Sequence, residues 1–183
     1  MSMIHMHYKL GVTAVLCETR CGHTSMQEHF NSILGLNITT VDAKNINLYE
    51  VDAIKAHRVV LVVRQPYDRL WSAKKNADRM VHEGYLKSSQ HDQSMSDHSS
   101  LYLHKLSQSS NITHIIPFEH LLEYIPVSTN TVQYHIEPNH TIFEDWMGNY
   151  HSEEDMQLEY SGYTKLLNDI PQFGVKKWQK YCE

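Results

Sequence analysis

The chain has 183 residues, of which 41% are hydrophobic and 20% charged, so its composition excludes a disordered or low-complexity protein. Its formal net charge of −5 argues against general nucleic-acid binding through a basic surface. No apolar run approaches the roughly 20 residues that span a bilayer, and no secretory signal is recognisable. The chain has only three cysteines and contains neither a Cys-x-x-Cys nor a His-x-x-x-His pair. We therefore expect one soluble, cytoplasmic domain over residues 1–183, with no membrane partner and no metal.

Strand-like and helix-like patterns alternate along the chain. The predicted elements, in chain order, are a strand at 13–17, a helix at 24–34, a strand at 38–41, a short helix at 48–56, a strand at 59–63, a helix at 66–81, a polar surface loop at 84–100, a helix at 101–106, a strand at 113–117, a helix at 119–124, an edge strand at 131–136 and a helix at 153–167. The unbroken apolar run at 59–63 is typical of a central parallel strand covered on both faces. The alternation predicts an α/β class, in which helices flank a central, mainly parallel sheet in three layers.

A first candidate anion-binding loop follows the strand at 13–17. It reads Arg20-Cys21-Gly22-His23-Thr24-Ser25. At a helix start, exposed backbone N–H groups and the helix dipole favour an anion. Arg20 would add a fixed positive charge, Gly22 would let the backbone approach the ligand, and the two hydroxyls would donate to phosphoryl or sulfuryl oxygens. A capped helix with an ordinary turn is the alternative. Cys21 would be either a low-pKa thiol or, more simply, a loop residue that contributes its backbone.

A second candidate site follows the strand at 59–63. It reads Arg64-Gln65-Pro66-Tyr67-Asp68-Arg69-Leu70-Trp71-Ser72-Ala73-Lys74-Lys75-Asn76. Arg64 leaves the strand end and Ser72 lies two helical turns into the next helix, so a guanidinium and a hydroxyl would converge on a second phosphate. The alternative is that Arg64 and Arg69 are surface residues paired with carboxylates such as Asp68.

Together these two segments resemble the sulfotransferase superfamily, especially its carbohydrate-sulfotransferase branch. The first loop is similar to the family's Lys/Arg-x-Gly-x-Thr-Ser/Thr motif. Residues 64–76 are similar to Arg-x-Pro-Tyr/Phe-x-Arg-Leu-x-Ser-Ala-Tyr-x-Asn, with Lys74 where Tyr is usual. Weaker similarities lie at 115–121, 138–141 and 169–174. The resemblance implies a three-layer, P-loop-like fold.

The resemblance also implies a cofactor and roles for individual residues. The sulfuryl donor would be 3′-phosphoadenosine 5′-phosphosulfate, which leaves as adenosine 3′,5′-bisphosphate, and no metal would be needed. Residues 20–25 would hold the 5′-phosphosulfate, with Arg20 beside the bridging oxygen as the catalytic cation. Arg64 and Ser72 would hold the 3′-phosphate.

The implied activity is transfer of a sulfuryl group to a hydroxyl or amine of a small-molecule or glycan acceptor. The motifs do not identify the catalytic base. Asp42 is the first candidate and Glu50 the second, with a solvated surface carboxylate as the alternative for both. Two other functions stay open: a degenerate member of the fold that binds nucleotide without turnover, and a small P-loop kinase. The kinase motif Gly-x-x-x-x-Gly-Lys-Ser/Thr is missing from the loop.

Overall fold

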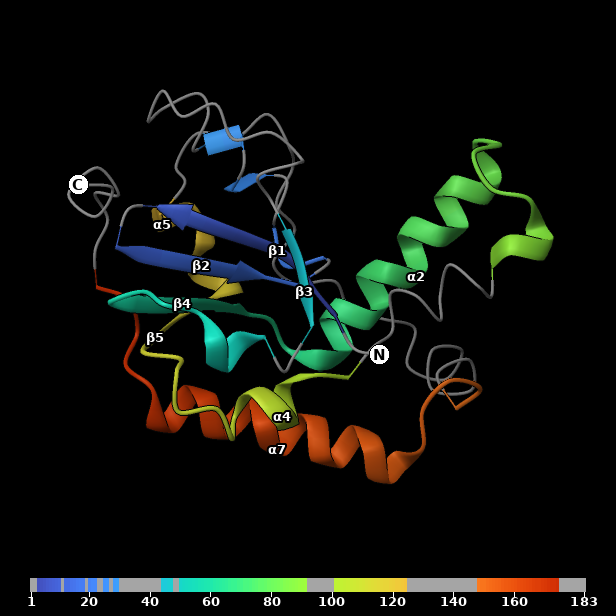
Figure 1. Cartoon of the computed structure of the whole chain (residues 1–183). Helices are drawn as coiled ribbons and strands as arrows, with labels where there is room; N and C mark the ends of the chain where they lie inside the picture. The colour runs from blue at the N-terminus through green and yellow to red at the C-terminus, as the bar shows by residue number, and fades with distance from the viewer. Residues whose placement is uncertain are drawn as a thin grey trace.

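The computed structural model describes residues 3–10, 12–18, 20–22, 25–26, 28–29, 44–47, 50–91, 101–124 and 148–174; for 3–10, 44–47 and 122 it describes the backbone alone. A five-stranded sheet in the order β3-β1-β2-β4-β5 forms the centre of this part of the chain (Figure 1). The strands are β1 (Met3–Leu10), β2 (Thr13–Cys17), β3 (Lys44–Asn47), β4 (Arg58–Val63) and β5 (His114–Pro117).

The sheet is mixed rather than mainly parallel. β2 runs parallel to β4, with Leu16 opposite Leu61, and β4 runs parallel to β5, with Leu61 opposite Ile115. β1 is antiparallel to both of its neighbours, β2 and β3. The coarse α/β class is confirmed by the three parallel strands and their helices. The predicted parallel character holds for those three strands alone.

Four helices are described from end to end: α2 (Pro66–His82), α4 (Leu103–Leu106), α5 (Leu121–Tyr124) and α7 (Glu153–Asp169). Short 3₁₀ turns lie at Val51–Ala53, Ser88–Gln90 and Phe118–His120. The four helices match predictions within a few residues, whereas the helix predicted at 48–56 is only the 51–53 turn. Residues 25, 26, 28 and 29 are helical, as predicted for 24–34. The strands predicted at 38–41 and 131–136 lie outside the described residues.

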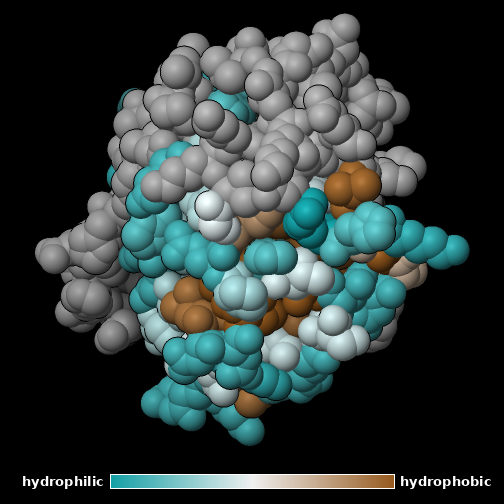
Figure 2. Space-filling model, turned by 90° about the vertical axis from the view of Figure 1, so that its left-hand side faces the viewer, coloured by the Kyte–Doolittle hydropathy of each residue, from teal (hydrophilic) through white to brown (hydrophobic). Residues whose placement is uncertain are grey.

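The hydrophobic core lies between the sheet and the pair α4 and α7, which run below it in Figure 1. Alternate residues of β4, namely Val59, Leu61 and Val63, pack there with Tyr102 and Leu166. The intervening valines of β4 are also fully buried, so both faces of this strand are covered, as its unbroken apolar run predicts. Figure 2 shows hydrophobic surface among hydrophilic residues on the side where α7 ends. No helix in the described ranges is long and apolar enough to cross a membrane.

A buried carboxylate fixes α4 to α7. Glu159, in the middle of α7, is only 1% exposed, and its two oxygens accept hydrogen bonds from the backbone N–H groups of Tyr102, Leu103 and His104 at 3.1, 2.9 and 3.3 Å. These are N–H groups at the helix start, which have no partner within the helix. Gly162 lies one turn further along α7, where a Cβ atom would be 2.4 Å from the His104 nitrogen. The contact also fixes Tyr102, whose ring lies next to the Arg69 guanidinium and whose hydroxyl lies next to the Cys21 sulfur.

The segment after α7 returns to the sheet edge. Gln172 forms a parallel bridge with Ile115, and the Phe173 N–H donates to the Ile115 carbonyl at 2.7 Å. The Tyr124 hydroxyl donates to the Phe173 carbonyl, and the Phe173 ring is buried against that of His114. Residues 171–173 therefore attach the described C-terminal part of the chain beside β5.

Candidate anion-binding site

The two sequence motifs meet at one edge of the sheet. Because β2 and β4 are parallel neighbours, the residues that follow them emerge at the same edge. The Arg20 Nε group donates to the Ser72 hydroxyl at 3.1 Å, and the Arg64 Nη1 group donates to the Arg20 carbonyl at 2.7 Å. Residues separated by 44 and 52 positions are thus in direct contact.

The loop after β2 has a constrained backbone. Arg20 has a φ of 67° and Gly22 a φ of 81°, both in the left-handed region. For a residue other than glycine this conformation costs roughly 1–3 kcal/mol, and it occurs most often at functional sites. The hydrogen bond from Arg64 to the Arg20 carbonyl supports the strained residue from outside the loop.

Gly22 is favoured by its left-handed φ, and it also lies close to other side chains. A Cβ atom at this position would lie 2.4 Å from Leu121 Cδ2 and 3.4 Å from Phe118 Cε2. The close approach is therefore to the segment that follows β5. The Cys21 N–H also donates to the Glu18 carbonyl at 3.0 Å, so this amide closes the turn.

Arg64 is buried as well as charged. Its side chain is 3% exposed, and its guanidinium carbon lies 4.1 Å from the centre of the Phe118 ring. Burial lowers the pKa of Arg64 below its usual value, and the nearby positive charges of Arg20 and Arg69 act in the same direction. Asp68 and Cys21 oppose this effect without reversing it. A positive charge in such surroundings is stabilised by an anion.

Arg69 is a buried member of this cluster that the sequence analysis did not place in the site. It is 1% exposed, and its guanidinium carbon lies 5.3 Å from the centre of the Tyr102 ring. Burial is the largest single influence and would lower its pKa, but Glu18, Tyr102, Cys21 and Glu159 together outweigh burial, so the pKa of Arg69 is raised. The surface alternative is therefore wrong for both Arg64 and Arg69.

The position of Arg69 on α2 could have indicated from the sequence that this side chain is buried. The buried face of α2 comprises Pro66, Arg69, Leu70, Ser72, Ala73 and Ala77. An arginine at a helical spacing that otherwise holds small and apolar residues indicates a charge taken into the interior, where it needs a carboxylate.

Cys21 is a buried residue of the loop. Its sulfur lies 3.8 Å from the Tyr102 hydroxyl, and burial raises the pKa of the Cys21 thiol to about 11, despite the nearby positive charges of Arg69 and Arg64. The low-pKa thiol interpretation is therefore wrong. Ser25 is buried and has helical conformation.

Several predicted site residues have no structural description here. His23, Thr24 and Asp42 lie outside the described residues, as does the segment 138–141. Glu50 is described and exposed. It precedes the 51–53 turn, whose Val51 carbonyl accepts a hydrogen bond from Asn111 ahead of β5. That contact links the Glu50 segment to the loop before β5, whereas the arginines follow the ends of β2 and β4.

The assembled residues have the chemistry of an oxyanion site. Arg20, Arg64 and Arg69 lie close enough for their charges to interact, and Ser72 adds a hydroxyl. A phosphate dianion would restore the interactions that burial removes from Arg20 and Arg64, because burial lowers the pKa of both. The cluster therefore fits the phosphate groups of the implied nucleotide. Within the described ranges, no group of three or more His, Cys, Asp or Glu residues could hold a metal ion.

Comparison with protein-family models, with curated proteins and with solved structures finds no match to this chain.

Proposed function

We propose that this protein is a sulfotransferase that uses 3′-phosphoadenosine 5′-phosphosulfate, built on a three-layer, P-loop-like fold. The observation that carries the proposal is the direct contact of Arg20 with both Ser72 and Arg64. The pairing of β2 with β4 brings the two segments to one edge, and the side-chain hydrogen bonds then join the residue types that each motif selects for anion binding. Their contact at the carboxyl edge of parallel strands supports one composite site for two anionic groups.

The residues divide the work between binding and catalysis. Arg64 and Ser72 hold the 3′-phosphate, with the Arg64 guanidinium fixed over Phe118. Arg20 and the loop amides hold the 5′-phosphosulfate. The donor supplies an activated sulfuryl group: its sulfur–oxygen bond to the phosphate breaks, a bond from sulfur to the acceptor oxygen or nitrogen forms, and the acceptor proton passes to a base. Arg20 stabilises the charge that develops on the bridging oxygen, and it stays protonated throughout.

The test measures nucleotide binding and transfer separately. Adenosine 3′,5′-bisphosphate should bind to the purified protein and stabilise it against thermal unfolding by about 2.7 kcal/mol at 100 times its dissociation constant. Adenosine 5′-monophosphate is the matched control, because it lacks the 3′-phosphate that Arg64 and Ser72 are expected to hold. Equal stabilisation by the two nucleotides at the same concentration would contradict the proposed 3′-phosphate site.

Transfer of labelled sulfate from the donor to a panel of glycans, phenols and amines then tests for catalysis. Transfer to any acceptor supports the enzyme. Nucleotide binding without transfer to any acceptor favours the degenerate, non-catalytic member of the fold. Stronger stabilisation by ATP with Mg²⁺ than by the bisphosphate would favour the kinase.

A further inference from the structure

Three tyrosines from two helices form a continuous aromatic surface beside the arginine cluster. The Tyr67 and Tyr160 ring centres lie 5.1 Å apart at 42°, and the Tyr160 and Tyr163 ring centres lie 6.3 Å apart at 86°. All three side chains are half-buried, so part of each ring reaches the surface. We call this set, Tyr67, Tyr160 and Tyr163, the tyrosine shelf.

The shelf adjoins the candidate anion site through α2. Tyr67 lies in the first turn of α2, three residues after Arg64. Its neighbour Asp68 lies close enough to Arg64, Tyr160 and Tyr163 for its charge to act on all three. A molecule resting on these rings would therefore lie next to the group that the arginines hold.

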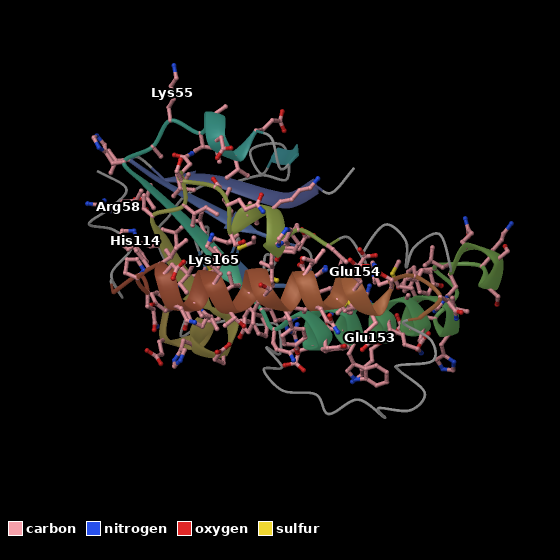
Figure 3. The ribbon with its side chains drawn as sticks, turned by 90° about the horizontal axis from the view of Figure 1, so that it is seen from below. Lys55, Arg58, His114, Glu153, Glu154 and Lys165 are labelled. Atoms are coloured by element: carbon pink, nitrogen blue, oxygen red, sulfur yellow. The ribbon has the colours of Figure 1, made fainter. Side chains whose placement is uncertain are left out.

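Two carboxylates lie close enough to the shelf for their charges to act on its tyrosines. Besides Asp68, the exposed Glu119 follows β5 and its charge acts on Tyr163, whose pKa is raised to about 12, first by burial and then by these two carboxylates. Glu153 lies seven residues before Tyr160, on the same face of α7. Figure 3 shows Glu153 and Glu154 at the N-terminal end of α7, beside α2, whereas Lys165, His114 and Arg58 lie toward its C-terminal end. The carboxylates whose charges act on the shelf tyrosines are Asp68 and Glu119.

We propose that the tyrosine shelf is the acceptor-binding surface and that it selects an uncharged, ring-bearing acceptor of the pyranoside type over a polyanionic one. Aromatic rings pack against the apolar faces of sugar rings, and carboxylates accept hydrogen bonds from sugar hydroxyls. The same carboxylates repel anionic acceptors, so specificity comes from repulsion as well as attraction. This inference rests on the proposed function, since it concerns the acceptor of that reaction.

A matched pair of probes tests the inference by calorimetry, with adenosine 3′,5′-bisphosphate bound. The chitotetraose used here is fully N-acetylated and therefore uncharged, and a hyaluronan tetrasaccharide has as many sugar rings but carries carboxylates. Chitotetraose should bind at least about tenfold more tightly, the effect of one unfavourable charge contact. Glu119→Gln should reduce this discrimination by improving hyaluronan binding, and Glu154→Gln, on another face of α7, should not. Equal affinity for the two probes in the wild-type protein would overturn the inference.

Tyrosine variants test the location. Tyr160→Ala should weaken chitotetraose binding by about tenfold, because it removes one stacking ring. Tyr160→Phe keeps the ring and should retain most of the affinity, so it separates stacking from any loss of folding. Tyr85→Ala, at a tyrosine that is 73% exposed beyond the end of α2, is the control and should bind as the wild type does. Unchanged binding by a folded Tyr160→Ala protein would place the acceptor elsewhere.

The two proposals fail in different ways. If the bisphosphate binds but neither saccharide does, the shelf inference is wrong and the proposed function stands. If the bisphosphate does not bind, the proposed function is wrong whatever the saccharides do.

Discussion

Arg64 and Arg69 are two buried arginines on either side of the start of α2. The same substitution should change the free energy of unfolding far more at Arg69 than at Arg64. Arg64→Met and Arg69→Met each replace a guanidinium with a flexible apolar side chain in an interior position. Both side chains are at most 3% exposed, so burial is matched between them. The direction of their pKa shifts differs: the pKa of Arg64 is lowered, first by burial, whereas the pKa of Arg69 is raised because Glu18 and three further groups together outweigh burial.

The expected stabilities follow from these surroundings. Arg69→Met leaves the buried Glu18 without its opposing charge, which should destabilise the protein by about 3–5 kcal/mol. Arg64→Met loses a charged hydrogen bond to the Arg20 carbonyl, which contributes about 1.5–3 kcal/mol, and a ring contact of about 0.5–2 kcal/mol. It also removes a desolvation penalty of several kcal/mol. Because these terms offset one another, Arg64→Met should unfold within about 1 kcal/mol of the wild type.

Urea unfolding and nucleotide titration of the same proteins provide the measurements. Arg64→Met should stay folded yet bind adenosine 3′,5′-bisphosphate about 30- to 4,000-fold more weakly, the effect of losing a charged partner. Near-equal destabilisation by the two substitutions, or a larger loss for Arg64→Met, would refute the different electrostatic roles assigned to these arginines. Unchanged nucleotide affinity in Arg64→Met would refute the 3′-phosphate assignment.

Three further predictions concern the scaffold. Glu159→Ala should lose about 3–5 kcal/mol in urea unfolding, because it leaves N–H groups at the start of α4 buried without acceptors, and the exposed Glu154→Ala should lose under 1 kcal/mol. Gly162→Ala should lower the free energy of unfolding by about 2–3 kcal/mol because the added Cβ atom displaces α4. Gly174→Ala is the control and should be near neutral, since nothing lies within 4 Å of its Cβ position. Similar losses in the two variants would contradict the packing of Gly162 against α4. Burial lowers the pKa of His114, so below about pH 6.5 the unfolded state binds more protons than the folded state, and the free energy of unfolding falls as the solution is acidified. The His114→Asn protein should lose less stability than the wild type between about pH 7.5 and 5.5.

The sequence predicts the parallel part of the fold well because its strands are buried on both faces. The apolar run at 59–63 and the strand at 113–117 leave little choice of structure, and Pro66 marks the start of α2. β1 was missed although its residues alternate, with Ile4, Met6, Tyr8 and Leu10 separated by His5, His7 and Lys9. Such alternation is the usual pattern of a strand in an antiparallel pair, and the short connection to β2 completes a hairpin.

The candidate site was predicted in its residue types more than in its contacts. Motif spacing selects Arg20, Arg64 and Ser72 because anion chemistry requires those groups. That Arg20 bonds to Ser72 depends on the register of β2 against β4, which a local pattern does not contain. The close packing at Gly22 likewise depends on Leu121, 99 residues away in sequence, and no local signal predicts it. Burial of Arg69 was signalled by its helical spacing, but its counter-charge, Glu18, lies on another element.

The balance of charge in the cluster connects its stability to its function. Glu18 compensates Arg69 but leaves Arg20 and Arg64 with lowered pKa values, so this edge of the sheet is electrostatically unfavourable in the free protein. The strained φ of Arg20 adds to that cost. A site selected only for stability would replace such a buried cation with an apolar residue, since this substitution is often neutral or stabilising. Arg20 in its strained loop and the buried Arg64 after β4 are therefore expected together if an anion offsets the penalty when it binds. The free energy of unfolding should consequently depend more steeply on phosphate-bearing ligands than on ionic strength, and a greater stabilisation by sodium chloride than by adenosine 3′,5′-bisphosphate would contradict this reasoning.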